Sequence, residues 1–114
     1  WNTASVTNMQ GMFYEATAFN NGGAALTWAN TAAVKNMQRM FLHATSFNQD
    51  VSEWNTESVT DMMMMFYGAT SFNRDLSSWT VANIDTDGSK CAYFERYAVA
   101  WTLPKPALPA SCLG

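Results

Sequence analysis

Hydrophobic and polar residues follow one pattern that the chain repeats at nearly constant intervals. The third copy, residues 54–73, reads WNTESVTDMMMMFYGATSFN, and residues 1–20 and 29–48 are close variants of it. A fourth copy starts at residue 79 as WTVANI and then diverges. The first aliphatic residues of the four copies are Val6, Val34, Val59 and Ile84, at intervals of 28, 25 and 25 residues. Such a period is typical of proteins in which each unit buries its apolar face against its neighbours.

The longer first interval comes from extra residues within 21–25, NGGAA. With this insertion placed, Ala29 aligns with Trp1, Trp54 and Trp79. We therefore interpret Trp28 as a tryptophan displaced by one residue from the repeated position.

Each copy predicts a short strand followed by a short helix. Alternation about Asn55 suits a strand with Trp54 and Thr56 facing inward. Stacked strands would form a parallel sheet whose open face carries a polar row, namely Asn2, Asn30, Asn55 and Thr80. The spacing of the next apolar residues, i, i+3, i+6 and i+7, predicts one buried helical stripe, namely Val59, Met62, Met65 and Phe66.

The turns of each copy carry further regularities. Ser58 precedes the predicted helix with Asp61 three residues later, a capping pattern, and Gly68 suits the helix end. One aromatic residue per copy should stack as a column in the core, namely Phe19, Phe47 and Phe72. The asparagine after each of them should bond to turn backbone, namely Asn20, Asn48 and Asn73.

The order V-x-x-M-x-x-M-F-x-x-A-T-x-F-N, followed by D-(V/L)-S-x-W-N-T, resembles the repeat of BspA-like leucine-rich-repeat surface proteins over residues 1–84. This resemblance implies a right-handed α/β solenoid with a short parallel sheet on one side and short helices on the other. About 3.5 repeats would precede a C-terminal cap. Members of the family are mostly regarded as adhesion or protein-binding modules.

The predicted domain organisation is a repeat solenoid over 1–84 and a cap over 85–114. The repeats fall near 1–25, 26–50 and 51–75, with a partial one at 76–84. In the cap, apolar residues at helical spacing between Phe94 and Trp101 predict a short amphipathic helix, and three prolines follow it.

Cys91 and Cys112 are the two cysteines of the chain, and both lie in the predicted cap. Cys91 follows Ile84 as Phe66 follows Val59, so it should point inward. We predict a disulfide between the two cysteines, with a pair of buried free thiols as the alternative. A disulfide would imply an oxidising compartment: extracellular, on the cell surface, or another lumen.

Composition narrows the classes of partner. The net charge of −3 gives no basic field for nucleic acid, and no apolar run reaches the roughly 20 residues of a membrane span. Charged residues are 13% of the chain and aromatic residues 14%, a balance that fits a secreted, lumenal or assembled protein.

Catalytic and metal chemistry find little support in the sequence. His43 is the one histidine, and its position holds Glu15 and Gly68 in other copies, which indicates an exposed turn. We expect no enzyme activity, no metal site and no cofactor. Asp50 and Asp75 are equivalent residues that could attract calcium or form a solvated edge with Arg74 between them, and the sequence leaves both open.

Three candidate surfaces remain. The polar row can bind an extended peptide or a glycan, or be ordinary solvated surface. An exposed Trp28 beside that row would favour a glycan, because aromatic platforms bind sugars. Met63 and Met64 replace Gln10-Gly11 and Gln38-Arg39 of the other copies, so they are a candidate contact patch.

The sequence therefore predicts a non-enzymatic repeat scaffold for protein interaction or adhesion, exposed on a surface or built into a larger assembly. A carbohydrate-binding module is the alternative. We also expect the N-terminal end of the stack to be covered by upstream repeats or another protein, because an uncovered end exposes apolar surface.

Overall fold

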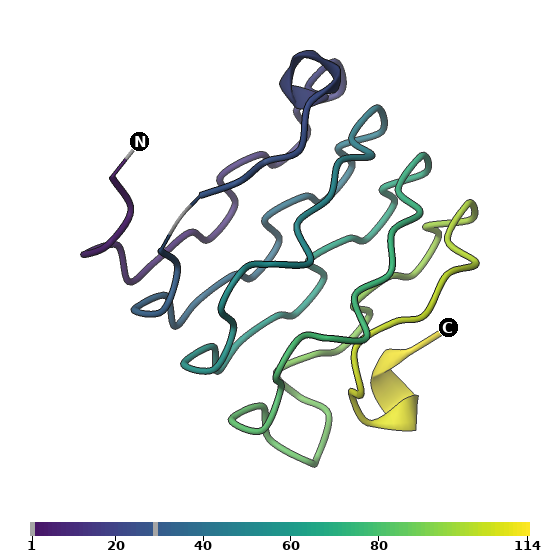
Figure 1. The fold of residues 1–114 in the computed structure, drawn as a ribbon. Helices are drawn as coiled ribbons and strands as arrows, with labels where there is room; N and C mark the ends of the chain where they lie inside the picture. The colour runs from purple at the N-terminus through teal and green to yellow at the C-terminus, as the bar shows by residue number, and fades with distance from the viewer. Residues whose placement is uncertain (1, 29) are drawn as a thin grey trace.

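A computed structural model describes residues 2–28 and 30–114. Successive repeats wind past one another and lie side by side, so the purple and yellow ends of the described chain lie at opposite ends of the stack (Figure 1). The molecule measures 36 × 33 × 22 Å. The predictions that a strand begins at Trp1 and that Ala29 takes the tryptophan position fall outside the described residues.

The predicted solenoid of a parallel sheet and short helices is wrong. The helices of the described residues are two short 3-10 turns, η1 (Asn21–Gly23) and η2 (Ala110–Cys112). In place of a sheet, the same part of the chain has isolated parallel bridges that join Asn8 to Asn36 and Asn36 to Asp61. The repeats therefore stack as irregular coils.

Sideways hydrogen bonds explain why the helical stripe forms no helix. Backbone N–H groups of alternate residues donate to the next repeat, as Met64 does to Ala92 (3.0 Å) and Phe66 to Phe94 (2.8 Å). The residues between them close turns within the repeat, as the Tyr67 N–H does on the Met64 carbonyl. Met64 and Gly68 have φ of 55° and 67°, whereas an α-helix needs φ near about −63° throughout.

The same pattern joins every pair of neighbouring repeats. The bonds run between four ladder segments, which are residues 9–15, 36–43, 61–68 and 90–97. Each junction has four of these bonds, and in all of them the earlier repeat donates. The residues at two positions of each segment are left-handed, and they are Gly11, Glu15, Arg39, His43, Met64, Gly68, Tyr93 and Tyr97.

The predicted core is confirmed although its secondary structure is not. Val59, Met62, Met65 and Phe66 are all fully buried. Spacings of three and four residues also bring side chains to one side of a coil built from consecutive turns. Trp54 and Thr56 face inward and Asn55 outward, as the alternation predicted.

Aromatic side chains form columns along the stack. The predicted column is confirmed, because Phe47 stacks on Phe19 at 5.7 Å and on Phe72 at 5.8 Å. A second column runs beside it through Phe13, Phe41 and Phe66 at 5.3 and 5.2 Å.

The predicted asparagine ladder is also confirmed, and it joins repeats. The side-chain oxygen of Asn20 accepts the Asn48 N–H, and that of Asn48 accepts the Asn73 N–H, each at 2.8 Å. Asn73 then accepts from the N–H groups of Thr102 and Leu103. These bonds give a partner to backbone N–H donors that would otherwise be unpaired at the turns.

The tail continues the stack. The predicted helix between Phe94 and Trp101 is absent, and residues 90–96 instead accept the sideways bonds of the third ladder segment. Glu95 is buried, and its carboxylate accepts the N–H of Gly114. The division of the chain into 1–84 and 85–114 stays a prediction.

The predicted disulfide between Cys91 and Cys112 is confirmed, with the two Cα atoms 5.4 Å apart. Both residues are buried, and the bond ties the fourth ladder segment to η2. It is consistent with an oxidising compartment.

Replacement of Phe47 by alanine should lower the free energy of unfolding by about 3–5 kcal/mol, because this fully buried ring stacks on both sides. Tyr14, 49% exposed, is the control, and Tyr14→Ala should change stability by less than about 1 kcal/mol. Urea unfolding measures both. Equal losses in the two variants would contradict the core described here.

Loss of the disulfide should destabilise the end of the stack first. Its two cysteines are 21 residues apart, so Cys91→Ser with Cys112→Ser should cost about 3 kcal/mol. Hydrogen exchange should show earlier opening of 90–112 than of 37–68. Thiol titration of the denatured protein should find no thiol before reduction, and any thiol found would contradict the bond.

Candidate functional site

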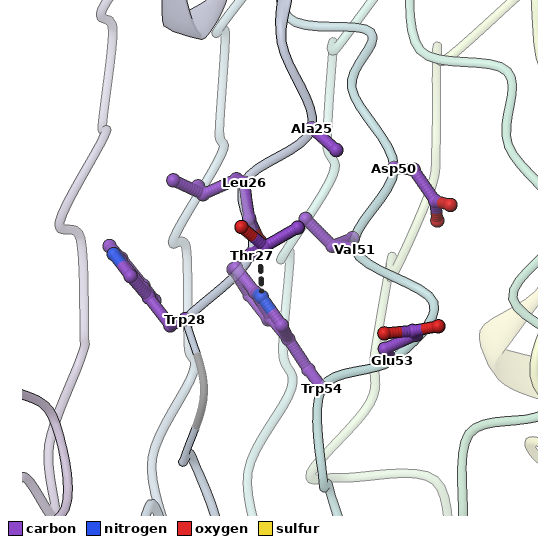
Figure 2. Close-up of a pocket in the computed structure, with 8 residues that line it drawn as sticks. All are labelled: Ala25, Leu26, Thr27, Trp28, Asp50, Val51, Glu53 and Trp54. Atoms are coloured by element: carbon purple, nitrogen blue, oxygen red, sulfur yellow. Dashed lines mark hydrogen bonds between the residues drawn. The ribbon is translucent and has the colours of Figure 1, made fainter.

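A cavity of about 250 Å³ lies where the segment after η1 packs against the following repeat. Its lining residues are Ala25, Leu26, Thr27, Trp28, Asp50, Val51, Glu53 and Trp54. Figure 2 shows Trp28 and Trp54 with nearly parallel rings, and the carboxylates of Asp50 and Glu53 on the side away from Trp28. Indole edges and carboxylates thus share one concave surface.

Trp28 stacks in one column with Trp54 and Trp79 despite its displacement by one residue in the sequence. Its ring stacks on Trp54 at 5.2 Å and lies 6.2 Å from Phe13, and the side chain is half-buried. Trp54 in turn stacks on Trp79 at 6.3 Å, and its Nε1–H donates to the Leu26 carbonyl (2.8 Å). Because neighbouring rings cover these faces, the indoles offer mainly edges to a ligand.

The Asp50 carboxylate has its own hydrogen-bond donors. Ser52 donates from its hydroxyl and its backbone N–H, and these bonds, with a smaller effect of the nearby Arg74 charge, hold the pKa of Asp50 below its usual value. The Arg74 guanidinium itself donates to the Asn48 carbonyl. Glu53 is exposed at the rim. The Asp50 and Glu53 carboxylates of the cavity can therefore accept hydrogen bonds from hydroxyl or amide donors of a ligand.

Asp75 and Asp87 repeat the arrangement of Asp50. Asp75 accepts the Ser77 hydroxyl at 2.6 Å and its N–H at 2.9 Å, and Asp87 accepts the Ser89 N–H at 2.8 Å. These bonds lower the pKa of both carboxyls. Across residues 2–28 and 30–114, no three histidine, cysteine, aspartate or glutamate side chains gather in a way that could hold a metal ion.

The structure places every member of the predicted polar row, Asn2, Asn30, Asn55 and Thr80, at the surface. Threonine hydroxyls link successive members, as Thr31 Oγ1 does to the Asn55 carbonyl and Thr56 Oγ1 to the Thr80 carbonyl. Each asparagine side-chain oxygen accepts the N–H two residues later, as Asn55 does from Glu57 at 3.0 Å. The row therefore offers its amide N–H donors outward, while its oxygens are engaged.

The predicted contact patch separates into two environments. Met63 and Met64 are both half-buried, and Met63 continues the column of Gln10 and Gln38. Met64 instead lines a second cleft with four residues outside the predicted surfaces, namely Tyr67, Tyr93, Arg96 and Tyr97. His43 is exposed, and its ring meets the Tyr67 ring edge-on at 5.6 Å.

A correct alignment of the fourth copy with the third would have predicted where these tyrosines lie. Residues 91–102, CAYFERYAVAWT, align with residues 62–73, MMMMFYGATSFN, once four extra residues are placed after Ile84. The sideways bonds give this same alignment. The alignment was missed because cysteine, glutamate and tryptophan replace methionine and phenylalanine at core positions of the fourth copy.

The free energy of unfolding should fall as the pH is lowered from about 5, because carboxyls of ordinary pKa begin to protonate there. The pKa values of Asp50, Asp75 and Asp87 are lower in the folded than in the unfolded state, so their stabilisation is complete above the unfolded pKa. It is lost as the pH falls through the folded pKa.

Ser77→Ala tests this cause. Removal of the hydroxyl donor should raise the pKa of Asp75, leave the pKa of Asp50 unchanged, and reduce the loss of stability between pH 5 and pH 3. Carbon-detected NMR titration and thermal unfolding measure the two effects. An unchanged Asp75 pKa would show that the hydroxyl bond does not hold it down.

No helix that the structure describes in 2–28 or 30–114 combines the length and the apolar character needed to cross a bilayer. No curated protein and no solved structure matches the chain significantly. One family, described as "Mycoplasma protein of unknown function, DUF285", matches residues 1–99. This match extends past residue 84 into the fourth ladder segment. The chain therefore belongs to this family, which is of the BspA-like repeat type.

Proposed function

We propose that the chain is a non-enzymatic repeat scaffold that binds other proteins, on a cell surface or within a larger extracellular assembly. The observation that carries this proposal is a contrast between positions of the stack that face inward and those that face outward. Core positions keep one kind of residue through the first three repeats, while most outward positions of the same segments change.

The contrast is clear where neighbouring positions are compared. An inward position holds alanine throughout, as Ala16, Ala44, Ala69 and Ala98. The left-handed position just before it holds Glu15, His43, Gly68 and Tyr97, and the one before that holds Tyr14, Leu42, Tyr67 and Arg96. Of these eight residues only Leu42 and Gly68 are buried. A constant core with a varied surface is the division of roles that repeat proteins use for recognition.

Two further features support binding to a protein. The polar row offers a line of outward amide donors, which suits an extended segment rich in carbonyl acceptors. The Cys91–Cys112 disulfide supports a location outside the reducing cytosol, where adhesion and surface proteins act. Neither feature requires bond-making chemistry.

Carbohydrate binding is the second candidate, and the cavity beside Trp54 favours it. Asp50 and Glu53 could accept hydrogen bonds from sugar hydroxyls there. The covered indole faces argue against it, because a sugar ring would find only the exposed part of Trp28 to pack on. Protein binding is therefore the better-supported proposal.

Capture on the immobilised chain from an extract of its source organism, followed by mass spectrometry, should identify a protein partner. The purified partner should then bind the chain in solution. A test variant with Met63→Gln and Met64→Arg carries the residues of the second repeat, Gln38 and Arg39, so it should fold normally. We expect it to bind the partner more weakly.

A glycan array is the opposing measurement. Specific binding to a sugar, lost in Trp28→Ala and in Glu53→Gln, together with no purified protein partner, would contradict the proposal and favour the carbohydrate alternative. Binding of a protein partner without any sugar signal is the expected result.

A further inference from the structure

Three tyrosines and one arginine surround a surface cleft of about 210 Å³ that the third and fourth ladder segments form together. We call it the tyrosine cleft, lined by Met64, Tyr67, Tyr93, Arg96 and Tyr97. The Arg96 guanidinium carbon lies 5.3 Å from the ring centroids of both Tyr93 and Tyr97. Tyr97 meets Tyr67 edge-on at 5.3 Å. The cleft is therefore an organised aromatic and cationic surface.

The core does not require the two outer tyrosines. Tyr93 is 47% exposed and Tyr97 is 56% exposed. Both line the same cleft, so their exposed rings lie together at the surface. Exposed apolar side chains that lie together mark interaction sites more often than scattered ones do.

The backbone gives an independent reason to assign these tyrosines a role outside folding. Tyr93 and Tyr97 have φ of 56° and 66°, a region that bulky residues rarely adopt. At the position of Tyr97, the preceding repeat has Gly68, which takes this conformation without strain. Tyrosine at both left-handed positions thus costs stability and adds little burial. Strained, exposed residues of this kind are found at binding sites.

Arg96 supplies the charge that defines the partner. Its guanidinium forms no ion pair within residues 2–28 and 30–114, and the neighbouring Glu95 carboxylate is turned inward onto Gly114. Two aromatic rings hold the cation in place and leave its N–H donors available. A carboxylate is the group that pairs best with such a fork of donors.

The size and composition of the cleft favour a protein over a small molecule. A volume of 210 Å³ is below the roughly 300–1,000 Å³ of small-molecule sites. Tyrosine, arginine and methionine are the residue types enriched in the cores of protein interfaces and among their strongest contacts. The side chains of a partner segment would fill such a cleft.

We propose that the tyrosine cleft binds an acidic segment of a partner protein, with an aspartate or glutamate carboxylate paired to Arg96 between Tyr93 and Tyr97. This inference rests on the proposed protein-binding function and assigns it a surface and a partner chemistry. The pairing is charge-assisted and lies at the protein surface, so added salt should weaken it.

The test uses the full chain and an array of random peptides in matched pairs. Each pair has one acidic peptide and the same peptide with Asn and Gln in place of Asp and Glu. We expect binding to acidic members, and about tenfold weaker binding for Arg96→Gln and for Tyr97→Gly. Lys35→Gln, which removes a charge elsewhere, and Tyr14→Ala, which removes an exposed tyrosine elsewhere, should bind as the wild type does.

Thermal unfolding separates binding from folding. Tyr93→Gly and Tyr97→Gly relieve left-handed strain, so their midpoints should equal or exceed the wild-type midpoint while binding falls. A lower midpoint in both variants would show that the tyrosines serve the fold, and would overturn the inference.

Other outcomes would overturn the inference without touching the proposed function. They are no acidic peptide bound, equal binding to both members of the pairs, or unchanged binding in Arg96→Gln. In each case a protein partner identified by capture would still bind the chain, through a different surface. Absence of any captured partner would instead count against the proposed function itself.

Discussion

The structure depends on backbone hydrogen bonds that run sideways between repeats. Each of the first three ladder segments donates four N–H groups to the next one, which leaves alternate residues to close short turns within the repeat. A backbone can divide its bonds in this way only where it turns into the left-handed region at fixed positions. Those positions recur in all four ladder segments, so the repeat of the sequence becomes a repeat of the coil.

Stacking follows from this ladder. Once successive coils are hydrogen-bonded in register, equivalent aromatic rings lie 5.2–5.8 Å apart in the two phenylalanine columns. Threonine hydroxyls add bonds in which the earlier repeat again donates, and asparagine side chains add bonds in which the later repeat donates. Apolar contact and polar pairing therefore depend on one register, and a shift of one residue would lose both.

The sequence predicted the inside of this molecule better than its backbone. Buried positions were readable because Val59, Met62 and Phe66 recur in kind from copy to copy. The helix was a wrong prediction because the same three- and four-residue spacing fits a chain of turns. The left-handed turns had a weak sequence signal, since only Gly11 and Gly68 among the eight left-handed residues of the ladder are glycines. The tyrosine cleft was missed because the fourth copy keeps the register but not the residues.

The left-handed positions connect the fold to the proposed recognition. Seven of the eight are at least partly exposed, Gly68 being the buried one, and the ladder fixes their places whatever side chain they carry. Glycine there would be least strained, yet six of the eight positions carry side chains. Each non-glycine residue exchanges some stability for a side chain held in a defined place. The fourth segment has made this exchange twice, with the largest side chains, beside an arginine without an acidic partner among the described residues. A scaffold selected for stability alone would have no reason to do so.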